Sequence, residues 1–186
     1  MRPFSAFTTK YHQKVNILVT PVKVVPRGQD DEMGFSCQAI WDTGAEISVI
    51  EQSVIDELGL KPDPTEETIT MVTPSGMRTA TPYRVDIVLP NGVRKIAQRV
   101  LDCVSLSDGQ MLIGMDIISS GDLAVTNENN NTVLSFRIPS VQTIDYVAQA
   151  NVINKDLAVR QKIARSSPSK QTRAKIRATR KKHKKS

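Results

Sequence analysis

From residue 14 to residue 139, short apolar segments rich in β-branched residues alternate with turns rich in Pro, Gly and Asn. This pattern predicts short strands joined by tight turns rather than long helices, and favours a mainly β domain. The segments expected to contain strands are 14–25, 35–50, 68–90, 88–96, 99–106 and 123–139, while segment 111–118 is apolar apart from Asp116 and contains a glycine that we expect to be buried.

Local signals refine three of these segments. In 35–41, Phe35, Cys37, Ala39 and Trp41 fall on one side of an alternating strand. Asn91-Gly92 is a hairpin signal between apolar strands. Residues 53–60 are predicted to form a short helix with Ser53 as its N-cap and Gly59 near its C-terminal end.

The pattern changes after residue 140. Val141, Ile144, Val147 and Ala148 recur at helical spacing, which predicts one or two helices to about residue 164. We therefore expect three parts: a globular domain over 1–140, a helical extension over 141–165 and a basic tail over 166–186. The tail has almost no apolar residues, and self-repulsion is expected to keep it extended or disordered.

The charge is divided unevenly between these parts. The chain has 186 residues and a net charge of +6, but residues 160–186 hold 12 basic residues and no acidic one. The remaining 13 basic residues stand against all 19 acidic ones, so the body carries a net charge of −6. Such a tail fits weak contact with nucleic acid or an acidic partner, or a solvated tail without a specific partner. No aromatic residue lies among its charges, so base stacking is not indicated.

Composition bears on cellular context. No apolar run reaches the roughly 20 residues that cross a bilayer, and the N-terminus has no apolar stretch of the kind found in signal peptides. Cys37 and Cys103 form neither a disulfide framework nor a metal-ligand pattern. We expect no membrane association, a cytoplasmic location, and neither a metal nor another cofactor.

The segment that carries chemistry is AIWDTGA, residues 39–45. Asp42 ends an apolar strand and is followed by Thr, Gly and a small residue. A second segment, MLIGMDII, places Gly114 72 residues after Asp42, behind two apolar residues. A predicted hairpin lies between the two. Over about residues 15–138 these elements resemble, in the same order, the retropepsin-like aspartic proteases, single-domain relatives of retroviral proteases. The resemblance implies a closed β-barrel of the acid-protease type with a short helix.

Peptide hydrolysis without a metal or a covalent nucleophile requires an activated water. Two carboxylates at close range share one proton, so the ionised one acts as general base while the protonated one polarises the carbonyl or protonates the leaving amine. This chain has one such motif, so the second carboxylate must come from Asp42 of another copy. The expected active unit is a homodimer with the site on its two-fold axis.

The resemblance also implies roles for the neighbours of Asp42. Thr43 would hydrogen-bond the partner's turn, Gly44 would allow the tight turn, and Ala45 would line the site. Leu112, Ile113 and Gly114 would support the loop from behind, while Asp116 is expected to cap the helix that follows. A flap is expected over residues 71–83, with Pro74, Ser75 and Gly76 at its tip and Met77 beside it; it would hold a peptide or protein substrate as an added strand.

Other interpretations stay open at this point. Asp42-Thr43-Gly44 alone is compatible with a polar β-turn, and the flap segment with a plain surface hairpin. The leading hypothesis is an aspartic endopeptidase. A second is a retropepsin-shaped module that binds peptides or proteins with little cleavage. A third is a nucleic-acid-associated protein in which residues 160–186 dominate.

Overall fold

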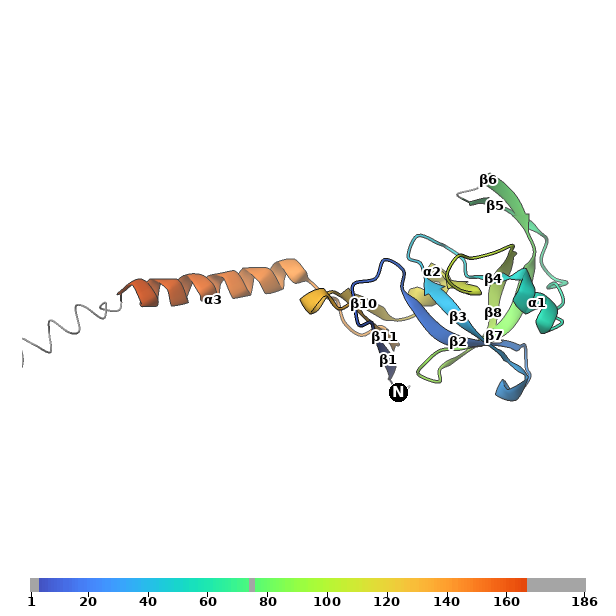
Figure 1. The fold of residues 1–186 in the computed structure, drawn as a ribbon, viewed down its shortest axis with the longest axis horizontal. Coiled ribbons are helices and arrows are strands. Elements are labelled where there is room, and N and C mark those ends of the chain that lie inside the picture. The colour runs from blue at the N-terminus through green and yellow to red at the C-terminus, as the bar shows by residue number, and fades with distance from the viewer. Residues whose placement is uncertain (1–3, 74–75, 167–186) are drawn as a thin grey trace, which may run out of the picture. The chain divides into compact units, whose positions relative to one another are not determined.

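The computed structural model describes residues 4–73 and 76–166. Two compact units divide the chain, 1–142 and 143–186. Pro74, Ser75 and all of the predicted tail except Ser166 lie outside the described residues. The strands and helices of the first unit are shown in Figure 1. None of the helices in the described segments is both long and apolar enough to cross a bilayer.

Six strands of the first unit close into a barrel in the order β2-β3-β9-β4-β8-β7, and β2 and β7 pair to complete it. Their bounds are β2 Val19–Pro26, β3 Phe35–Trp41, β4 Val49–Glu51, β7 Pro82–Val88, β8 Arg94–Cys103 and β9 Met111–Ile113. The 3-10 helix η1 (Asp31–Met33) joins β2 to β3, and the short helices α1 (Gln52–Glu57) and α2 (Met115–Ile118) follow β4 and β9. The prediction of a mainly β closed barrel with short helical elements is confirmed.

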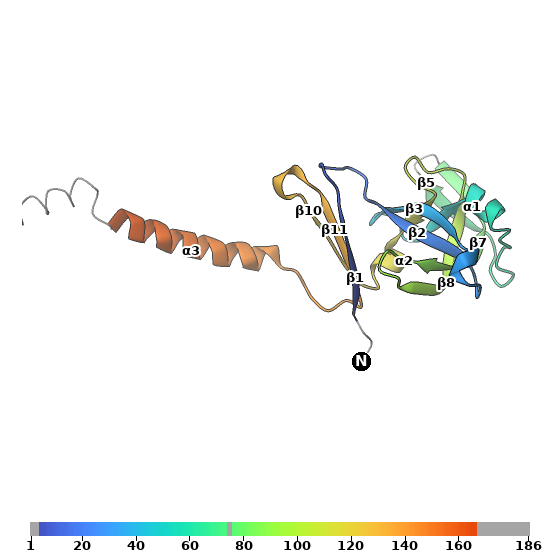
Figure 2. The same ribbon diagram turned by 60° about the horizontal axis from the view of Figure 1, so that its bottom comes forward.

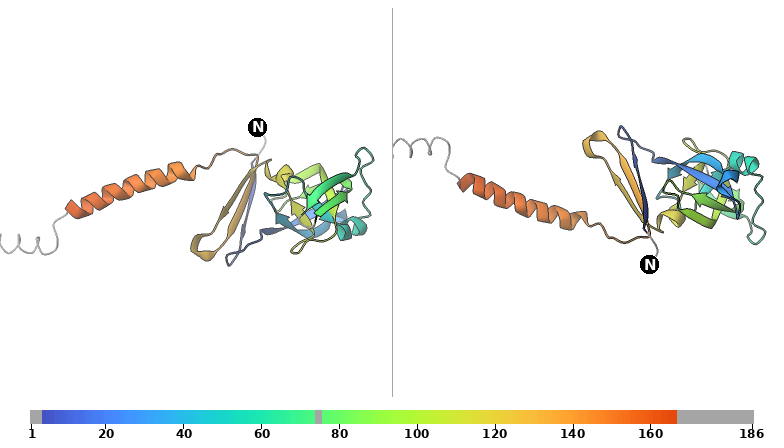
Figure 3. Two further views of the ribbon diagram at one scale, coloured as in Figure 1. Left: turned by 90° about the horizontal axis from the view of Figure 1, so that it is seen from above. Right: turned by 90° about the horizontal axis from the view of Figure 1, so that it is seen from below.

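Two smaller sheets accompany the barrel. One has three strands in the order β1-β11-β10, from Ser5–Lys10, Val133–Ile138 and Asp122–Thr126; the 3-10 helix η2 (Glu128–Asn130) joins β10 to β11. Figure 2 shows these strands side by side. The other is the hairpin of β5 (Ile69–Thr73) and β6 (Gly76–Ala80), which projects from the barrel in Figure 1 and is seen from above in Figure 3.

The barrel interior is filled by the inward faces of its strands. In β3, Cys37, Ala39 and Trp41 are buried while Ser36 and Gln38 are exposed, so the predicted alternation is confirmed. Trp41 also contacts the three-stranded sheet, with ring centroids 5.7 Å from Phe7 of β1 and 4.9 Å from Phe136 of β11. The sheet therefore packs directly against β3, the strand that ends just before Asp42.

Several predicted boundaries are wrong. The first barrel strand begins at Val19 rather than residue 14, and β1 was not predicted. Two segments were predicted to hold separate strands, the hairpin signal over 88–96 and the segment over 99–106. Both overlap one continuous strand, β8. Tyr83 belongs to barrel strand β7 and is 7% exposed, so it is not part of the flap hairpin.

The predicted N-cap of the first helix is also wrong. Helix α1 begins at Gln52, and Glu51 occupies the N-cap position without a side-chain cap. Ser53 lies within the helix, and its hydroxyl donates a hydrogen bond to the Glu51 carboxylate at 3.1 Å. The C-terminal signal is confirmed, since Gly59 has a φ of +58° just beyond the last turn.

The second unit contains one described helix, α3 (Tyr146–Ser166). Asp145 caps it, because its Oδ1 accepts hydrogen bonds from the backbone N–H groups of Val147 and Ala148 at 2.9 and 3.0 Å. The apolar side chains of the helix are exposed on more than one side; they include Val147, Val152, Ile153, Leu157, Val159 and Ile163.

Candidate active site

Asp42 follows the last residue of β3 and lies in a turn that is fixed at both of its ends. Its backbone N–H donates to the Ile113 carbonyl at 3.0 Å, and its own carbonyl accepts the Ala45 N–H at 3.3 Å. The side chain is half-buried, and its Oδ1 accepts the Gly44 N–H at 2.8 Å. Oδ2 has no hydrogen-bond partner among the residues that the structure describes. One carboxylate oxygen is therefore held by the turn and the other is available to a reacting group.

The other residues of the predicted loop flank this carboxylate. Thr43 and Gly44 are exposed, and Ala45 is half-buried. The Ala45 carbonyl accepts the Met115 N–H at 2.8 Å. The loop is thus bonded to the start of α2 as well as to β9, which limits where the Asp42 side chain can point.

The segment behind the loop consists of β9 and the residue that follows it. Leu112 pairs with Ile40 of β3 and with Val49 of β4. Ile113 is fully buried beside Trp41. A Cβ atom on Gly114 would lie 2.9 Å from the Ala45 carbonyl oxygen and 2.9 Å from the Ile47 carbonyl carbon. The structure thus brings Leu112, Ile113 and Gly114 together directly beneath residues 42–47.

Asp116 does not cap α2, because Gly114 occupies the N-cap position and makes no side-chain cap. The Asp116 carboxylate instead accepts hydrogen bonds from the Ser48 hydroxyl at 2.7 Å, the Ser48 N–H at 3.1 Å and the Gln98 side chain at 3.0 Å. It also accepts the Ile117 N–H at 2.9 Å. The predicted capping role is therefore replaced by a bridge between α2, Ser48 just before β4, and Gln98 of β8.

Ser48 is the supporting residue that sequence reasoning missed. It is fully buried, and its hydroxyl accepts the Gly114 N–H at 3.0 Å while donating to Asp116. One hydroxyl thus bonds two residues of the second motif to the chain three residues after the first. The sequence does carry a signal for this role. Ser48 stands among apolar residues six positions after Asp42, and a buried hydroxyl needs hydrogen-bond partners.

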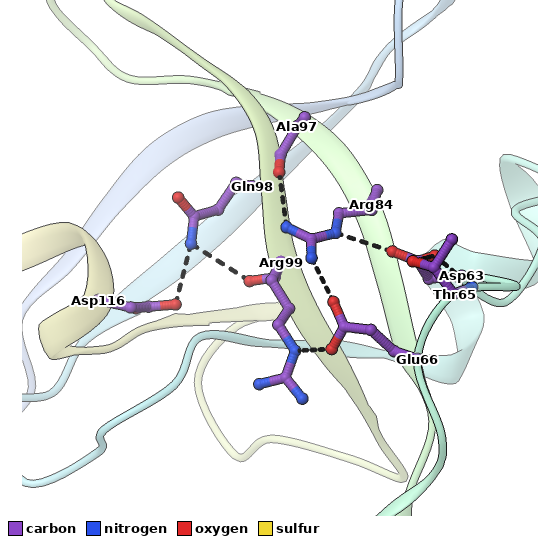
Figure 4. A network of polar contacts seen from close by, with 8 residues as sticks. All are labelled: Asp63, Thr65, Glu66, Arg84, Ala97, Gln98, Arg99 and Asp116. Carbon is purple, nitrogen blue, oxygen red and sulfur yellow. Dashed lines mark hydrogen bonds and ion pairs between the residues drawn. The ribbon is translucent and has the colours of Figure 1, made fainter.

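A second polar network holds the chain that leads into the hairpin of β5 and β6 (Figure 4). Arg84 of β7 donates to Asp63 at 2.8 Å and to Glu66, and Arg99 of β8 also donates to Glu66. Thr65 donates to Asp63 through both its hydroxyl and its N–H, and with Arg84 it lowers the pKa of that carboxyl to about 2. These bonds tie loop 61–68 to the barrel.

The flap residues that the structure describes are exposed near the end of the hairpin. Met77 is 79% exposed and pairs across the hairpin with Val72, which is 83% exposed. Gly76 is the first residue of β6 and has a φ of +116°. Apart from Pro74 and Ser75, which are not described, the predicted flap residues therefore lie on a hairpin outside the barrel.

The cysteines have no position suited to nucleophilic chemistry. Burial, with a contribution from Glu51, raises the pKa of the Cys37 thiol to about 12. Burial and the nearby Glu51 are also the main causes that raise the pKa of the Cys103 thiol to about 11. A thiol with so high a pKa is neutral and unreactive at ordinary pH. Among the described residues no cluster of three or more His, Cys, Asp or Glu side chains is arranged to hold a metal ion.

The chain is similar to a known protein family and to two solved structures. Residues 33–120 match the family model described as gag-polyprotein putative aspartyl protease. No curated protein matches. Similar solved structures include a retropepsin-like aspartic protease from Rickettsia conorii, with 15% identity and a TM-score of 0.46 over 74% of this chain and 98% of that one. The simian foamy virus (mac) protease has 19% identity and a TM-score of 0.34 over 53% of this chain and 91% of that one.

The family model spans both motifs, from just before β3 to just after α2. It covers Asp42 and its turn, the hairpin of β5 and β6, and the Gly114 segment that lies beneath the turn. The match of residues 33–120 to an aspartyl protease family model therefore supports the resemblance to the retropepsin-like aspartic proteases that the two motifs indicated.

Proposed function

We propose that the protein is an aspartic endopeptidase whose active unit is a homodimer with one Asp42 from each chain. The carrying observation is the turn at Asp42, in which Oδ1 is held by the Gly44 N–H and Oδ2 is left without a partner among the described residues. The chain supplies one Asp-Thr-Gly-Ala motif. A second copy related by a two-fold axis would supply the second carboxylate.

The chemistry follows from two carboxylates that share one proton. The ionised Asp42 takes a proton from water as the water attacks the peptide carbonyl carbon. The protonated Asp42 donates a hydrogen bond to the carbonyl oxygen as it gains negative charge, and a proton then passes to the leaving amine. Because one carboxylate must stay protonated, we expect an acidic pH optimum.

The remaining residues position the substrate. We assign Thr43 to contact with the partner's turn and Ala45 to the wall of the site. Gly76 and Met77, on the hairpin of β5 and β6, would cover an extended peptide or protein substrate and exclude water from it. The exposed Val72–Met77 pair supports this assignment, because it presents apolar side chains near the end of the hairpin.

The direct test compares the wild-type protein with Asp42→Asn on a diverse peptide pool between about pH 4 and pH 7, with products identified by mass spectrometry. The substitution nearly preserves shape and removes the shared proton. The matched control is Asp108→Asn, which makes the same change at an exposed residue of the loop before β9. Cleavage by the wild type and the control but not by Asp42→Asn is the expected result.

Mixing tests whether the two carboxylates come from two chains. Equimolar wild type and Asp42→Asn, refolded together, should leave roughly a quarter of the dimers with both carboxylates. Activity per wild-type chain should then fall to about half, since only dimers with two intact carboxylates cleave. If the activity per wild-type chain is the same with and without the Asp42→Asn chain, the two carboxylates do not come from two chains.

A catalytically weak module that binds peptides or proteins is the alternative. Two results together would favour it. The wild-type protein would be a folded dimer that cleaves no peptide in the pool, and it would bind peptides with an affinity that substitutions of Val72 and Met77 reduce. The intact motif at Asp42 favours the enzyme.

The basic run over residues 160–186 supports an additional, weak contact with nucleic acid or an acidic partner. Binding to DNA or RNA that weakens with salt and disappears when residues 166–186 are deleted is the expected outcome. Binding that survives the deletion would remove this role from the tail.

A further inference from the structure

The hairpin of β5 and β6 is a two-stranded sheet that is not part of the barrel. A two-stranded hairpin has little stability of its own in water. Its outward-facing side chains Val72 and Met77 are exposed. Its position relative to the Asp42 loop must therefore depend on the attachments at its base.

One barrel residue, Asp102 of β8, makes the attachments on the β6 side. Its Oδ2 accepts a hydrogen bond from the Arg78 guanidinium at 2.6 Å, and its Oδ1 accepts the Thr81 N–H at 2.5 Å. The Asp102 N–H donates to the Thr81 carbonyl at 3.1 Å. Asp102 thus holds the main chain where the hairpin leaves the barrel and, separately, a side chain three residues further into β6.

The ion pair is largely shielded from water. The side chains of Arg78 and Asp102 are 29% and 12% exposed. Below it, Ala80 is fully buried in a small apolar cluster with Val49 and Leu101. A charge-assisted hydrogen bond in such surroundings is stronger and better defined in geometry than one between fully solvated side chains.

Asp102 is also connected to the frame that carries Asp42. It pairs with Ile50 of β4, and the preceding residue, Leu101, donates its N–H to the Ser48 carbonyl at 3.1 Å. Ser48 in turn bonds Gly114 and Asp116 beneath the Asp42 loop. The bonds that hold β6 therefore start from the same strands that support the catalytic loop.

The β5 side has a separate attachment. Glu66, three residues before β5, pairs with Arg84 and Arg99 of the barrel. These pairs lie outside the hairpin and do not involve Arg78 or Asp102. Loss of the Arg78–Asp102 pair is therefore expected to free one strand of the hairpin while its other end stays attached.

We propose that Arg78 is a positioning residue, which through its ion pair with Asp102 holds the β5–β6 hairpin in register with the Asp42 loop and so raises the affinity for substrate. The role rests on the proposed peptidase function. Arg78 takes no part in bond cleavage; it acts on the hairpin.

The test is Arg78→Met, which keeps an apolar stem of similar length and removes the charge, made in the full-length protein. We expect KM to rise about five-fold while kcat changes less than about two-fold, because binding is weakened more than chemistry. Hydrogen exchange should be at least about ten-fold faster at the amides of residues 69–73 and 76–80, and unchanged at those of β3. Arg78→Lys, which restores a cation, should recover part of both effects.

The matched control is Arg137→Met. Arg137 pairs with Asp122 at 2.5 Å in the three-stranded sheet, with side-chain exposures of 34% and 17%, similar to those of the Arg78–Asp102 pair. It should leave KM and hairpin exchange unchanged. Asp102→Asn keeps an oxygen that can accept the Thr81 N–H, so adding it to Arg78→Met should change little, because the ion pair is already lost in the single variant.

Two results would overturn the role. One is normal hairpin exchange in Arg78→Met. The other is faster exchange spread through the barrel, which would make the pair a general stabiliser of the fold. If the wild-type protein cleaves no peptide, the proposed function fails while the exchange experiment still reports whether Arg78 holds the hairpin. If cleavage occurs and KM is unchanged despite faster exchange, the effect on substrate affinity is wrong.

Discussion

At the scale of single residues, the close passage of Gly114 behind the Asp42 loop determines how that loop is built. The backbone there has φ −94° and ψ −174°, a conformation open to any residue. What excludes a side chain is space, because a Cβ would lie 2.9 Å from backbone atoms of Ala45 and Ile47. The constraint is therefore steric and is transmitted directly to residues 42–47.

Gly114→Ala is expected to displace the Asp42 loop, lower kcat/KM at least about ten-fold and reduce the free energy of unfolding by about 1–3 kcal/mol, in the range of overpacking. Enzyme kinetics and urea unfolding measure the two effects. The control is Gly92→Ala in the turn after β7, where φ is +74° and an added Cβ would have no atom within 4 Å. It should cost about 1–2 kcal/mol through backbone strain and leave kcat/KM unchanged. Equal kcat/KM in Gly114→Ala and Gly92→Ala would contradict the inference that the space at Gly114 determines the position of the Asp42 loop.

The sequence motif singled out Asp42 and the Gly114 segment behind it, but the bonds that Asp116 makes beneath the loop could not be predicted. Asp116 has the position of a helix cap in sequence, and a nearby backbone N–H is the obvious partner for such a residue. Its side-chain partners, Ser48 and Gln98, lie 68 and 18 positions away and are brought to it only by the closed barrel. Local patterns cannot anticipate contacts of that range.

At the scale of secondary-structure elements, the strands that were predicted have alternating or continuous apolar faces. β3 and β7 bury such faces in the barrel, and both were expected. β1 was missed because Ser5–Lys10 offers one large apolar residue, Phe7. Its strand conformation comes from pairing with β11 and from packing of Phe7 on Trp41 and Phe136. Tertiary contacts therefore outweigh the weak local propensity.

Loop 61–68 gives a prediction about pH. Hydrogen bonds from Thr65 and the ion pair with Arg84 lower the folded-state pKa of Asp63 to about 2 from 3.8. The ionised form is thus favoured by folding, so its contribution to stability is present above about pH 4 and is lost as the pH falls through about 2.

Asp63→Asn should therefore destabilise the protein at pH 7 and flatten the decline in unfolding free energy between about pH 4 and pH 2. Urea unfolding at a series of pH values measures the difference from wild type. Thr65→Val removes the hydroxyl donor and should give part of the same change. A difference between wild type and Asp63→Asn that does not vary with pH would show that the carboxylate acts through packing alone.

At the scale of the whole molecule, both apolar cores lie within the first unit. Their last members are Leu134, Phe136 and Ile138. The second unit, from residue 143, contributes no described residue to either core. The stability of the barrel should therefore be independent of α3 and of the basic run.

Deletion of residues 143–186 should leave the barrel's melting temperature within about 2 °C of the full chain, since no core contact is lost. Circular dichroism should lose most of its helical signal, because α3 has 21 residues while α1 and α2 have six and four. Deletion from residue 133 is the contrasting variant. It removes β11 with Leu134 and Phe136 and should abolish cooperative melting. A large drop in melting temperature for the shorter deletion would contradict the independence of the units.

The position of Trp41 gives the protein an internal optical probe. It is the single tryptophan in the chain, 5% exposed, and adjacent in sequence to Asp42. Its indole N–H donates to the Thr20 hydroxyl at 2.8 Å, and its ring lies against Phe7 and Phe136. Its fluorescence therefore has one source. Detachment of the N-terminal strand would expose the indole to water and shift its emission to longer wavelength, so one spectrum reports on the surroundings of Asp42 without any label.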